Sequence, residues 1–382
     1  MENLVTANDS IGISLINLLI SDLYNQNWDY YYIKNKIFFV APKHQNKEHI
    51  KARMNINRQL ILSKHKNFIN DNLDILKNNL TSGPEAFQSP IKPIVEICKT
   101  KEQLSLFKMC RYYWSSPYSD YVGRRIKLII RDSGLPTNPI IGIAALGSPI
   151  MQISSRDNYI GWTNSQKRLK LNSTMDIYIL GAMPPYNDLL GGKLIAYILT
   201  SNEIRKIFTE KYSQEQLACM FTTSLYGRSS LYNRINYENK KLYNSVGYTK
   251  GIGTSHISSE TFELMVHLLK DMNLLPSNNL LTGGSNWKIR VIRQCCRVLN
   301  IDEDSLLKHN ISKEVFVIPL ANNYSDYLCE KEHDLNYYDF PLEEMIAYWK
   351  RRWLFPRRET IVSDKEKYRF FWYFTPDNFA IN

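Results

Sequence analysis

Residues 221–234 read FTTSLYGRSSLYNR, and in this run a buried strand gives way to a polar loop. The apolar pattern predicts a strand over 217–224, after which the run changes to hydroxyl groups, one glycine and two arginines, none of which helps to fill a core. Guanidinium forks suit phosphate or carboxylate. We therefore expect a site for an anionic or nucleotide-like ligand here, the alternative being a polar loop whose groups satisfy one another. The candidate residues are Ser224, Tyr226, Arg228, Ser229, Ser230, Tyr232, Asn233 and Arg234.

Strands and helices alternate around this run. The expected strands are 125–130 and 140–146, paired as a hairpin, followed by 150–154 and 175–180. The expected helices are 189–199 and 202–212, the second with a capping box from Thr200 and Glu203. This order predicts an α/β (α+β) fold with a mixed, partly parallel sheet.

Breaks in composition divide the chain into three expected domains: a helical, basic region at 1–97, the α/β core at 98–259, and a mainly helical region at 260–382 that completes the core. The prolines at 84, 90 and 93 mark the first boundary. The other expected elements are helices at 11–20, 46–80, 259–272, 287–299, 302–308 and 341–356, and a strand at 314–319.

Residues 187–194, NDLLGGKL, lie between an expected strand and an expected helix. Paired glycines allow close approach of a ligand to the backbone, and the N–H groups of a helix start attract phosphate. The run lacks the Walker A pattern but resembles the pyrophosphate-binding turn of GNAT-type acyltransferases. We therefore predict cofactor contacts from Leu190, Gly191, Gly192 and Lys193, with close packing of the glycines as the alternative.

Residues 242–248, LYNSVGY, resemble a GNAT-type pattern in which a tyrosine is the general acid near the leaving thiolate. That resemblance implies a GNAT-like core with Tyr243 as the acid, and we add Arg228 and Ser229 to the predicted catalytic set. A phenol suits protonation of a strongly basic leaving group only in the right geometry. The alternative for Tyr243 is aromatic packing.

Residues 154–162, SSRDNYIGW, combine an arginine, an aspartate and a tryptophan. Arg156 and Asp157 fit a structural ion pair that closes a turn. The alternative is that Asp157 orients Arg156 toward a ligand while Trp162 stacks on a base. Lys250 and the arginine run that includes Arg351 and Arg352 are further candidates for ligand or nucleic-acid contact.

The chain has 382 residues and a formal net charge of +11, which favours anionic partners and nucleic acid first. The basic helix expected over residues 43–66 and the arginines at 351–358 are the candidate contact surfaces. Lysine-rich composition from A/T-rich codons is the competing explanation for part of the charge.

Six cysteines without a CxxC pair predict a cytoplasmic protein with reduced thiols and no metal site. The apolar run at 11–20 lacks a positively charged flank and is too short to span a bilayer, so neither a signal peptide nor a membrane segment is expected.

Several of these motifs occur together, in order, in the DruA family of the Druantia antiphage systems, which this chain resembles from about residue 121 to 254. The matching runs are VGRR at 122–125, SP at 148–149, RD at 156–157, IGW at 160–162, LGGKL at 190–194, YGRSS at 226–230, YNR at 232–234, VGYTKG at 246–251 and GT at 253–254, with a weaker echo at 349–356. The resemblance implies a prokaryotic antiviral component with a helicase-like partner.

Two hypotheses follow. In the first, the protein binds nucleic acid, with DNA favoured, and its GNAT-like core recognises this ligand without catalysing a reaction on it. In the second, it is an acyltransferase that uses acetyl-CoA or another acyl-CoA on a nucleic acid or a protein. Because similar domains occur in transposon-associated proteins, a DNA-processing role is a further alternative, although clustered acids for a two-metal site are missing from the sequence.

Overall fold

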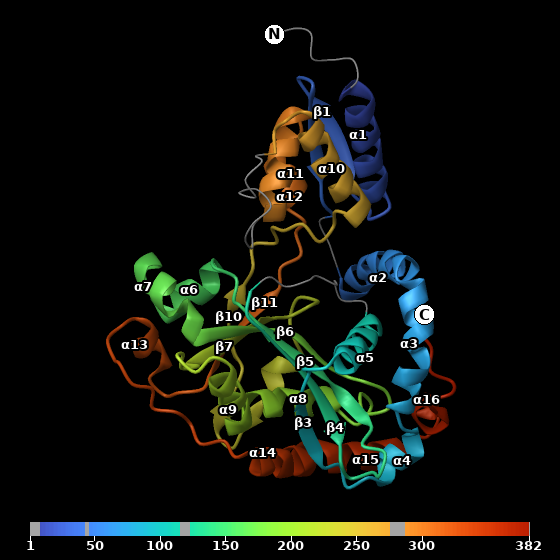
Figure 1. The fold of residues 1–382 in the computed structure, drawn as a ribbon, viewed down its shortest axis with the longest axis vertical. Coiled ribbons are helices and arrows are strands. Elements are labelled where there is room, and N and C mark those ends of the chain that lie inside the picture. Colours follow the sequence, from blue (N-terminus) through green and yellow to red (C-terminus); the bar gives the residue numbers. More distant parts are fainter. Residues whose placement is uncertain (1–7, 43–45, 115–122, 276–286, 382) are drawn as a thin grey trace. The chain divides into compact units, whose positions relative to one another are not determined.

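The computed structural model describes residues 8–42, 46–114, 123–275 and 287–381 (Figure 1). They form two compact units, each built from distant parts of the chain. One unit comprises residues 1–57 and 249–313, and the other comprises residues 58–248 and 314–382. Of the residues singled out above, Val122 and Lys43 lie outside the described ranges. The three-part division at 97/98 and 259/260 stays a prediction about domains.

The larger unit is built on a seven-stranded mixed sheet, as the expected α/β class requires. The strand order is β10-β11-β7-β6-β5-β4-β3, and β6 and β7 are the one parallel pair within it. The strands are β3 (Pro93–Ile97), β4 (Arg125–Asp132), β5 (Ile140–Gly147), β6 (Thr174–Ala182), β7 (Cys219–Thr223), β10 (Asn244–Tyr248) and β11 (Glu314–Pro319).

Helices cover both faces of this sheet. On one face α3 (Lys66–Asn78) and α5 (Lys101–Tyr112) pack on strand residues that include Ile129 and Ile143. On the other face the strands present residues such as Leu128 and Ala144 to a larger core. The helices of that face are α8 (Gly191–Thr200), α9 (Asn202–Lys211), α14 (Leu342–Trp349) and α15 (Phe355–Ser363). Successive side chains of β4 and β5 point to opposite faces of the sheet, because side chains alternate with a period of two along a strand.

Shorter elements complete the larger unit: α4 (Gly83–Gln88), α6 (Ser154–Ile160), α7 (Asn164–Lys170), β8 (Asn236–Tyr237), β9 (Lys240–Lys241), α13 (Tyr324–Leu328) and α16 (Arg369–Tyr373).

The smaller unit has a core of its own. It contains the helix α1 (Asn8–Tyr24), a hairpin of β1 (Asp29–Ile33) with β2 (Lys36–Val40), and the helices α10 (Ser259–Asp271), α11 (Trp287–Val298) and α12 (Glu303–Leu307). The region 1–97 therefore holds strands as well as the expected helices.

The hairpin of β4 with β5 and the strands β6, β7 and β11 confirm the expected strands, but the strand expected at 150–154 is wrong. Side-chain contacts replace a strand partner there. The N–H of Ile150 donates to Asp176 at 3.0 Å and the N–H of Ile153 to Asp157 at 3.3 Å. The carbonyl of Ile150 accepts from Arg156 at 2.7 Å.

Three helix predictions need correction. The helix expected over 46–80 is interrupted at His65, between α2 (Lys47–Lys64) and α3. The capping box expected from Thr200 and Glu203 does not form, because the hydroxyls of Thr200 and Ser201 donate back to the carbonyls of Tyr197 and Ile198 in α8. The final helix expected over 341–356 changes after Trp349 into a π-helical turn, Lys350–Leu354.

A buried carboxylate fixes the end of β4. Asp132 is fully buried and accepts hydrogen bonds from the hydroxyls of Ser89 at 2.6 Å and Tyr186 at 2.8 Å. It also accepts from the backbone N–H groups of Lys92 at 2.8 Å and Gly134 at 2.9 Å. Asp132 thus joins the edge strand, the β4–β5 turn and the segment before α8.

We expect Asp132→Ala to lower the free energy of unfolding by about 3–5 kcal/mol, because several buried donors lose their acceptor. Urea unfolding followed by circular dichroism measures the change. Asp74→Ala, which removes an exposed carboxylate from α3, is the control and should stay within about 0.5 kcal/mol of the parent. Equal stability of the two variants would contradict the proposed role of Asp132.

Candidate functional site

A buried carboxylate organises the loop after β7. Glu314, at the start of β11, is 4% exposed, and β11 pairs directly with β7. Its carboxylate accepts from the N–H of Ser229 at 2.7 Å, from Nδ2 of Asn233 at 2.8 Å and from Oγ of Ser245 at 2.7 Å. Burial opposes ionisation, but these hydrogen bonds and the nearby charge of Arg228 lower the pKa of Glu314. The loop therefore folds over a charged acceptor.

The predicted loop residues divide into two groups. Ser224, Ser229 and Asn233 bond within the loop or to β11, as the alternative of a satisfied polar loop requires. Arg228 and Arg234 are exposed, and neither forms an ion pair within the described ranges. The loop thus presents two guanidinium groups on a well-bonded frame. Of the other candidates, Tyr226 is half-buried and Ser230 is exposed.

Tyr243 is fully buried. Its ring stacks on Tyr232 at a centroid distance of 5.1 Å, and its hydroxyl donates to the carbonyl of Ala196 in α8 at 2.9 Å. Burial, followed by the neighbouring Tyr232 and Tyr197, raises the pKa of Tyr243. This geometry favours the packing interpretation of Tyr243. Its catalytic role, with Arg228 and Ser229, stays a prediction.

The glycines before α8 serve a tight turn. Leu190 has a φ of 60°, and the N–H of Gly191 donates to Tyr186 at 2.8 Å. A Cβ on Gly191 would lie 2.8 Å from the carbonyl oxygen of Tyr186, so close packing alone requires this glycine. The N–H of Gly192 finds no acceptor within the described residues. The first turn of α8 therefore retains one amide that can face an anion.

Four cations gather beside this turn, and we call Lys193, Arg234, Arg352 and Arg357 the cationic cluster. Lys193 is 8% exposed, and its Nζ lies 4.1 Å from the ring centroid of Trp353. The guanidinium of Arg352 lies 4.8 Å from the same centroid. Burial, and then the charges of Arg234, Arg352 and Arg357, lower the pKa of Lys193 to about 8.

Compensating acids are scarce at the cationic cluster. None of its four members forms an ion pair within the part of the chain that the structure describes. One carboxyl that feels the charge of Arg357 is Asp188, whose pKa is raised by burial and lowered in part by Arg357. The guanidinium of Arg357 also donates to the hydroxyl of Tyr368. The structure thus brings together three predicted segments: the turn at 190–193, the loop at 224–234 and the arginine run at 351–358.

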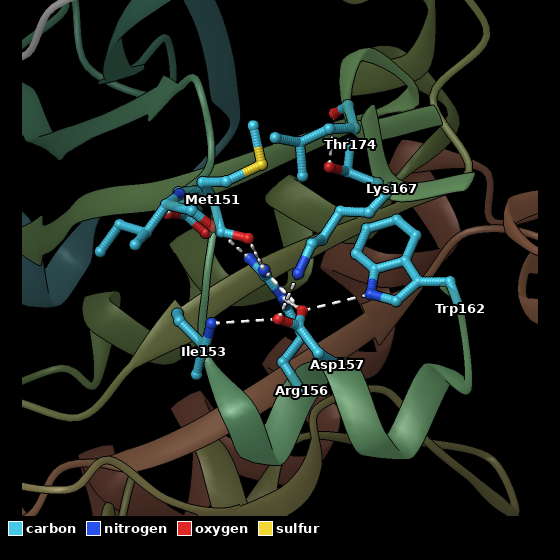
Figure 2. A network of polar contacts seen from close by, with 10 residues as sticks. Met151, Ile153, Arg156, Asp157, Trp162, Lys167 and Thr174 are labelled. Carbon is cyan, nitrogen blue, oxygen red and sulfur yellow. Dashed lines mark hydrogen bonds and ion pairs between the residues drawn. The ribbon is translucent and has the colours of Figure 1, made fainter. Parts of the chain in front are cut away.

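The Arg156–Asp157 pair forms a second polar network, which is buried (Figure 2). Arg156 has no exposed surface and donates to both Asp157 and the carbonyls of Ile150 and Met151. Asp157 also accepts from Nζ of Lys167 at 2.8 Å. Burial opposes ionisation of Asp157, but these donors outweigh it and its pKa is lowered. The network fits the structural ion pair that the sequence favoured.

Trp162 belongs to the same network. Its indole N–H donates to Asp157 at 3.2 Å, and the side chain is 7% exposed (Figure 2). The guanidinium of Arg156 lies 5.7 Å from the Trp162 ring and 4.8 Å from that of Phe221 in β7. In this conformation the indole is occupied by protein contacts, and its stacking on a base stays a prediction.

The remaining candidates are members of neither the cationic cluster nor the Arg156 network. Arg351 is exposed and lies over Tyr348 at 5.6 Å. Lys250 is exposed and belongs to the smaller unit. In the basic helix, Arg58 is buried and donates to the carbonyl of Tyr112 at 2.9 Å. Among the described residues, no set of three His, Cys, Asp or Glu side chains is placed to hold a metal ion, and no helix has the length and apolarity to cross a bilayer.

Comparison with known proteins identifies the family. Residues 44–330 match the family described as Druantia protein DruA. The chain is also 35% identical over 291 residues to the Druantia protein DruA of Escherichia coli (strain UMEA 4076-1), covering 72% of this chain and 71% of that protein. This chain belongs to the Druantia DruA family. It is accordingly a component of a Druantia antiphage defence system. No solved structure matches it.

The family match includes all seven strands of the large sheet, together with Lys193, Arg234 and Glu314. Arg352, Trp353 and Arg357 follow the matched region. The cationic cluster therefore combines residues from the matched and unmatched parts of the chain.

Two residues around which the site is built, Glu314 and Trp353, were not predicted as site residues. Glu314 could have been found from the sequence, because it directly precedes the apolar run VFVIP of a buried strand. A carboxylate at such a position needs hydrogen-bond donors around it. Trp353 could not have been found in this way, because an aromatic residue in an amphipathic helix usually packs in the core.

Asp176, next to the Arg156 network, provides a pH test. Burial raises its pKa to about 7, although a hydrogen bond from the N–H of Ile150 and the charge of Arg156 oppose the rise. Between about pH 4 and 7 the unfolded chain loses this proton while the folded chain keeps it, so Asp176 lowers stability as the pH rises. We expect the free energy of unfolding of Asp176→Asn, measured by denaturant unfolding, to exceed that of the parent by a few kcal/mol at pH 7. Near pH 3.5 the two values should be similar. An unchanged stability difference across this range would contradict the assignment.

Proposed function

We propose that this member of the Druantia DruA family is a nucleic-acid-binding component of its defence system, with DNA as the favoured ligand. The cationic cluster contacts the phosphate backbone. A helicase-like partner, implied by the family resemblance, acts beside it. One observation carries the proposal: a nearly buried lysine lies among three arginines with no ion pair to any of them in the described residues.

The electrostatics of the cationic cluster favour a bound anion. Burial and then charges of like sign disfavour the protonated form of the Lys193 amine, and together they lower its pKa. A phosphate would relieve it by supplying the missing negative charge. Arginine forks and the Gly192 amide can donate to phosphate oxygens, and Trp353 fixes Lys193 and Arg352 on one ring.

The proposal includes a GNAT-like core. Its support is the position of α8, which leaves the end of the central strand β6 and crosses over to the parallel neighbour β7. Such a crossover puts a helix start beside the ends of the strands, where phosphate groups bind in many α/β folds.

The same position of α8 favours a second candidate, an acyl-CoA-dependent acyltransferase that would bind the cofactor pyrophosphate at the cationic cluster. Calorimetric titration with acetyl-CoA separates the two candidates. The second candidate would replace the first if the parent gives binding heat with acetyl-CoA that Gly192→Glu lacks, and if the parent shows no salt-dependent binding to duplex DNA.

We expect duplex binding to weaken steeply with salt and to lose part of that steepness in Arg234→Gln and Arg352→Gln. Each lost phosphate contact lowers the slope of log K against log salt by about 0.9, equally for all sequences. Fluorescence anisotropy over a salt series measures the slope. Arg168→Gln, which removes an exposed arginine from α7, is the matched control and should keep the parent slope. A slope that is the same in all three variants would contradict the assignment to the cationic cluster.

Lys193 predicts a pH effect on the same binding. With a pKa of about 8, the free protein loses this charge between pH 7 and 9, while an anion binds the protonated form better. We therefore expect affinity for duplex DNA to fall over this range in the parent, and the fall to be absent in Lys193→Met. Lys206→Met, on the exposed side of α9, serves as the control and should retain the fall. Identical pH profiles of Lys193→Met and the parent would exclude Lys193 from the interface.

A further inference from the structure

The exposed side of α11 in the smaller unit is strongly basic. Trp287–Val298 reads WKIRVIRQCCRV and contains four cationic side chains and no acidic one. The helix buries Val291, Ile292, Cys295 and Cys296, each at most 1% exposed. These residues belong to the core that α11 shares with α1, α10 and the hairpin.

The polar side of α11 repeats at helical spacing. Arg290, Arg293 and Arg297 follow at intervals of three and four, so they share one face, opposite the buried one, and all three are exposed. Gln294 borders the same face. Glu303 of α12 lies 3.7 Å from Arg297, in a pair whose arginine side chain is 67% exposed. Such an exposed pair contributes little stability and leaves the arginine available to a ligand.

A β-hairpin flanks the C-terminal end of α11. The N–H of Ile37 donates to the carbonyl of Asn300 at 3.0 Å, and Nδ2 of Asn300 donates to the carbonyl of Asn35 in the hairpin turn at 2.9 Å. Nζ of Lys36 pairs with Asp302 at 2.9 Å. These contacts fix the hairpin beside the helix.

The outer strand of this hairpin exposes three consecutive tyrosines. Tyr30, Tyr31 and Tyr32 are 43%, 46% and 59% exposed, and Tyr31 stacks on Phe38 of β2. Their hydroxyls, together with Lys34 in the turn, are donors of the kind that contact phosphate and sugar oxygens.

We infer that the smaller unit is a reader of duplex DNA, with α11 in the major groove and the hairpin against the adjacent backbone. A major groove admits one α-helix, and arginine and glutamine on its outer face match guanine and adenine edges. This inference rests on the proposed function only for the class of ligand, because it uses a different unit and adds sequence selectivity to backbone binding.

Selection from a random duplex pool with the full-length protein, at about 0.15 M salt, tests the inference. The parent should select a preferred sequence, and methylation of guanine N7 in that sequence should interfere with binding. Arg293→Gln should lower affinity for the selected duplex about 5- to 150-fold and abolish interference at one guanine. Lys270→Gln, which removes an exposed charge from α10, is the matched control and should stay within about twofold.

Arg293→Lys separates base reading from charge. It keeps the cation but loses the bidentate fork, so binding to random duplex should persist while the preference for that guanine disappears. Thermal unfolding checks that each variant is folded, which the exposure of Arg293 leads us to expect.

The outcomes distinguish this inference from the proposed function. If the parent binds duplex with a salt dependence set by Arg352 but selects no sequence, the inference that the smaller unit reads DNA is overturned. The proposed role of the cationic cluster is then unaffected, and an acidic protein becomes the partner of α11. Arg293→Gln matching Lys270→Gln on the selected duplex overturns the inference as well. A parent that binds no duplex at any salt overturns both.

Discussion

The parallel pairing of β6 with β7 constrains the rest of the large unit. Parallel neighbours cannot be joined by a tight turn, so the chain between them must leave the sheet and cross over. The helices α8 and α9 make this crossing, and α8 is buried along almost its whole length under α14. Its first turn therefore lies in a protein environment, and Lys193, which a surface helix would leave in water, becomes a nearly buried amine.

Burial of Lys193 gives the cationic cluster its character. In a low-dielectric setting, repulsion between like charges is stronger than at an open surface. Lys193, Arg234 and Arg352 come from three distant segments, and Trp353 holds two of these side chains against one ring. A positive site of this kind is destabilising by itself, and the proposed anion would relieve it, which distinguishes it from the scattered lysines elsewhere on the chain.

Buried carboxylates hold the polar segments around the sheet. Glu314 accepts from the 224–234 loop, Asp157 from Arg156, Lys167 and Trp162, and Asp132 from the turn that follows β4. In each case one acceptor satisfies several donors, so an irregular segment keeps a single conformation. The two exposed arginines of the 224–234 loop depend on the first of these carboxylates, since it fixes the backbone that carries them.

The sequence alone determined the strands β4, β5, β6, β7 and β11, the helices α8 and α10, and the family, because apolar periodicity and ordered short motifs are local properties of the chain. It also identified the turn at 190–193 and the arginines as candidates for anion contact. Only the tertiary structure decided which of them meet. Arg156 and Trp162 turned inward because both donate to the carboxylate of Asp157, and Tyr243 because Ala196 offered a carbonyl. The parallel strand pair forces a buried crossover, and this brought together Lys193, Arg234 and Arg352. Because these residues are distant in sequence, the local pattern of one segment does not predict the others.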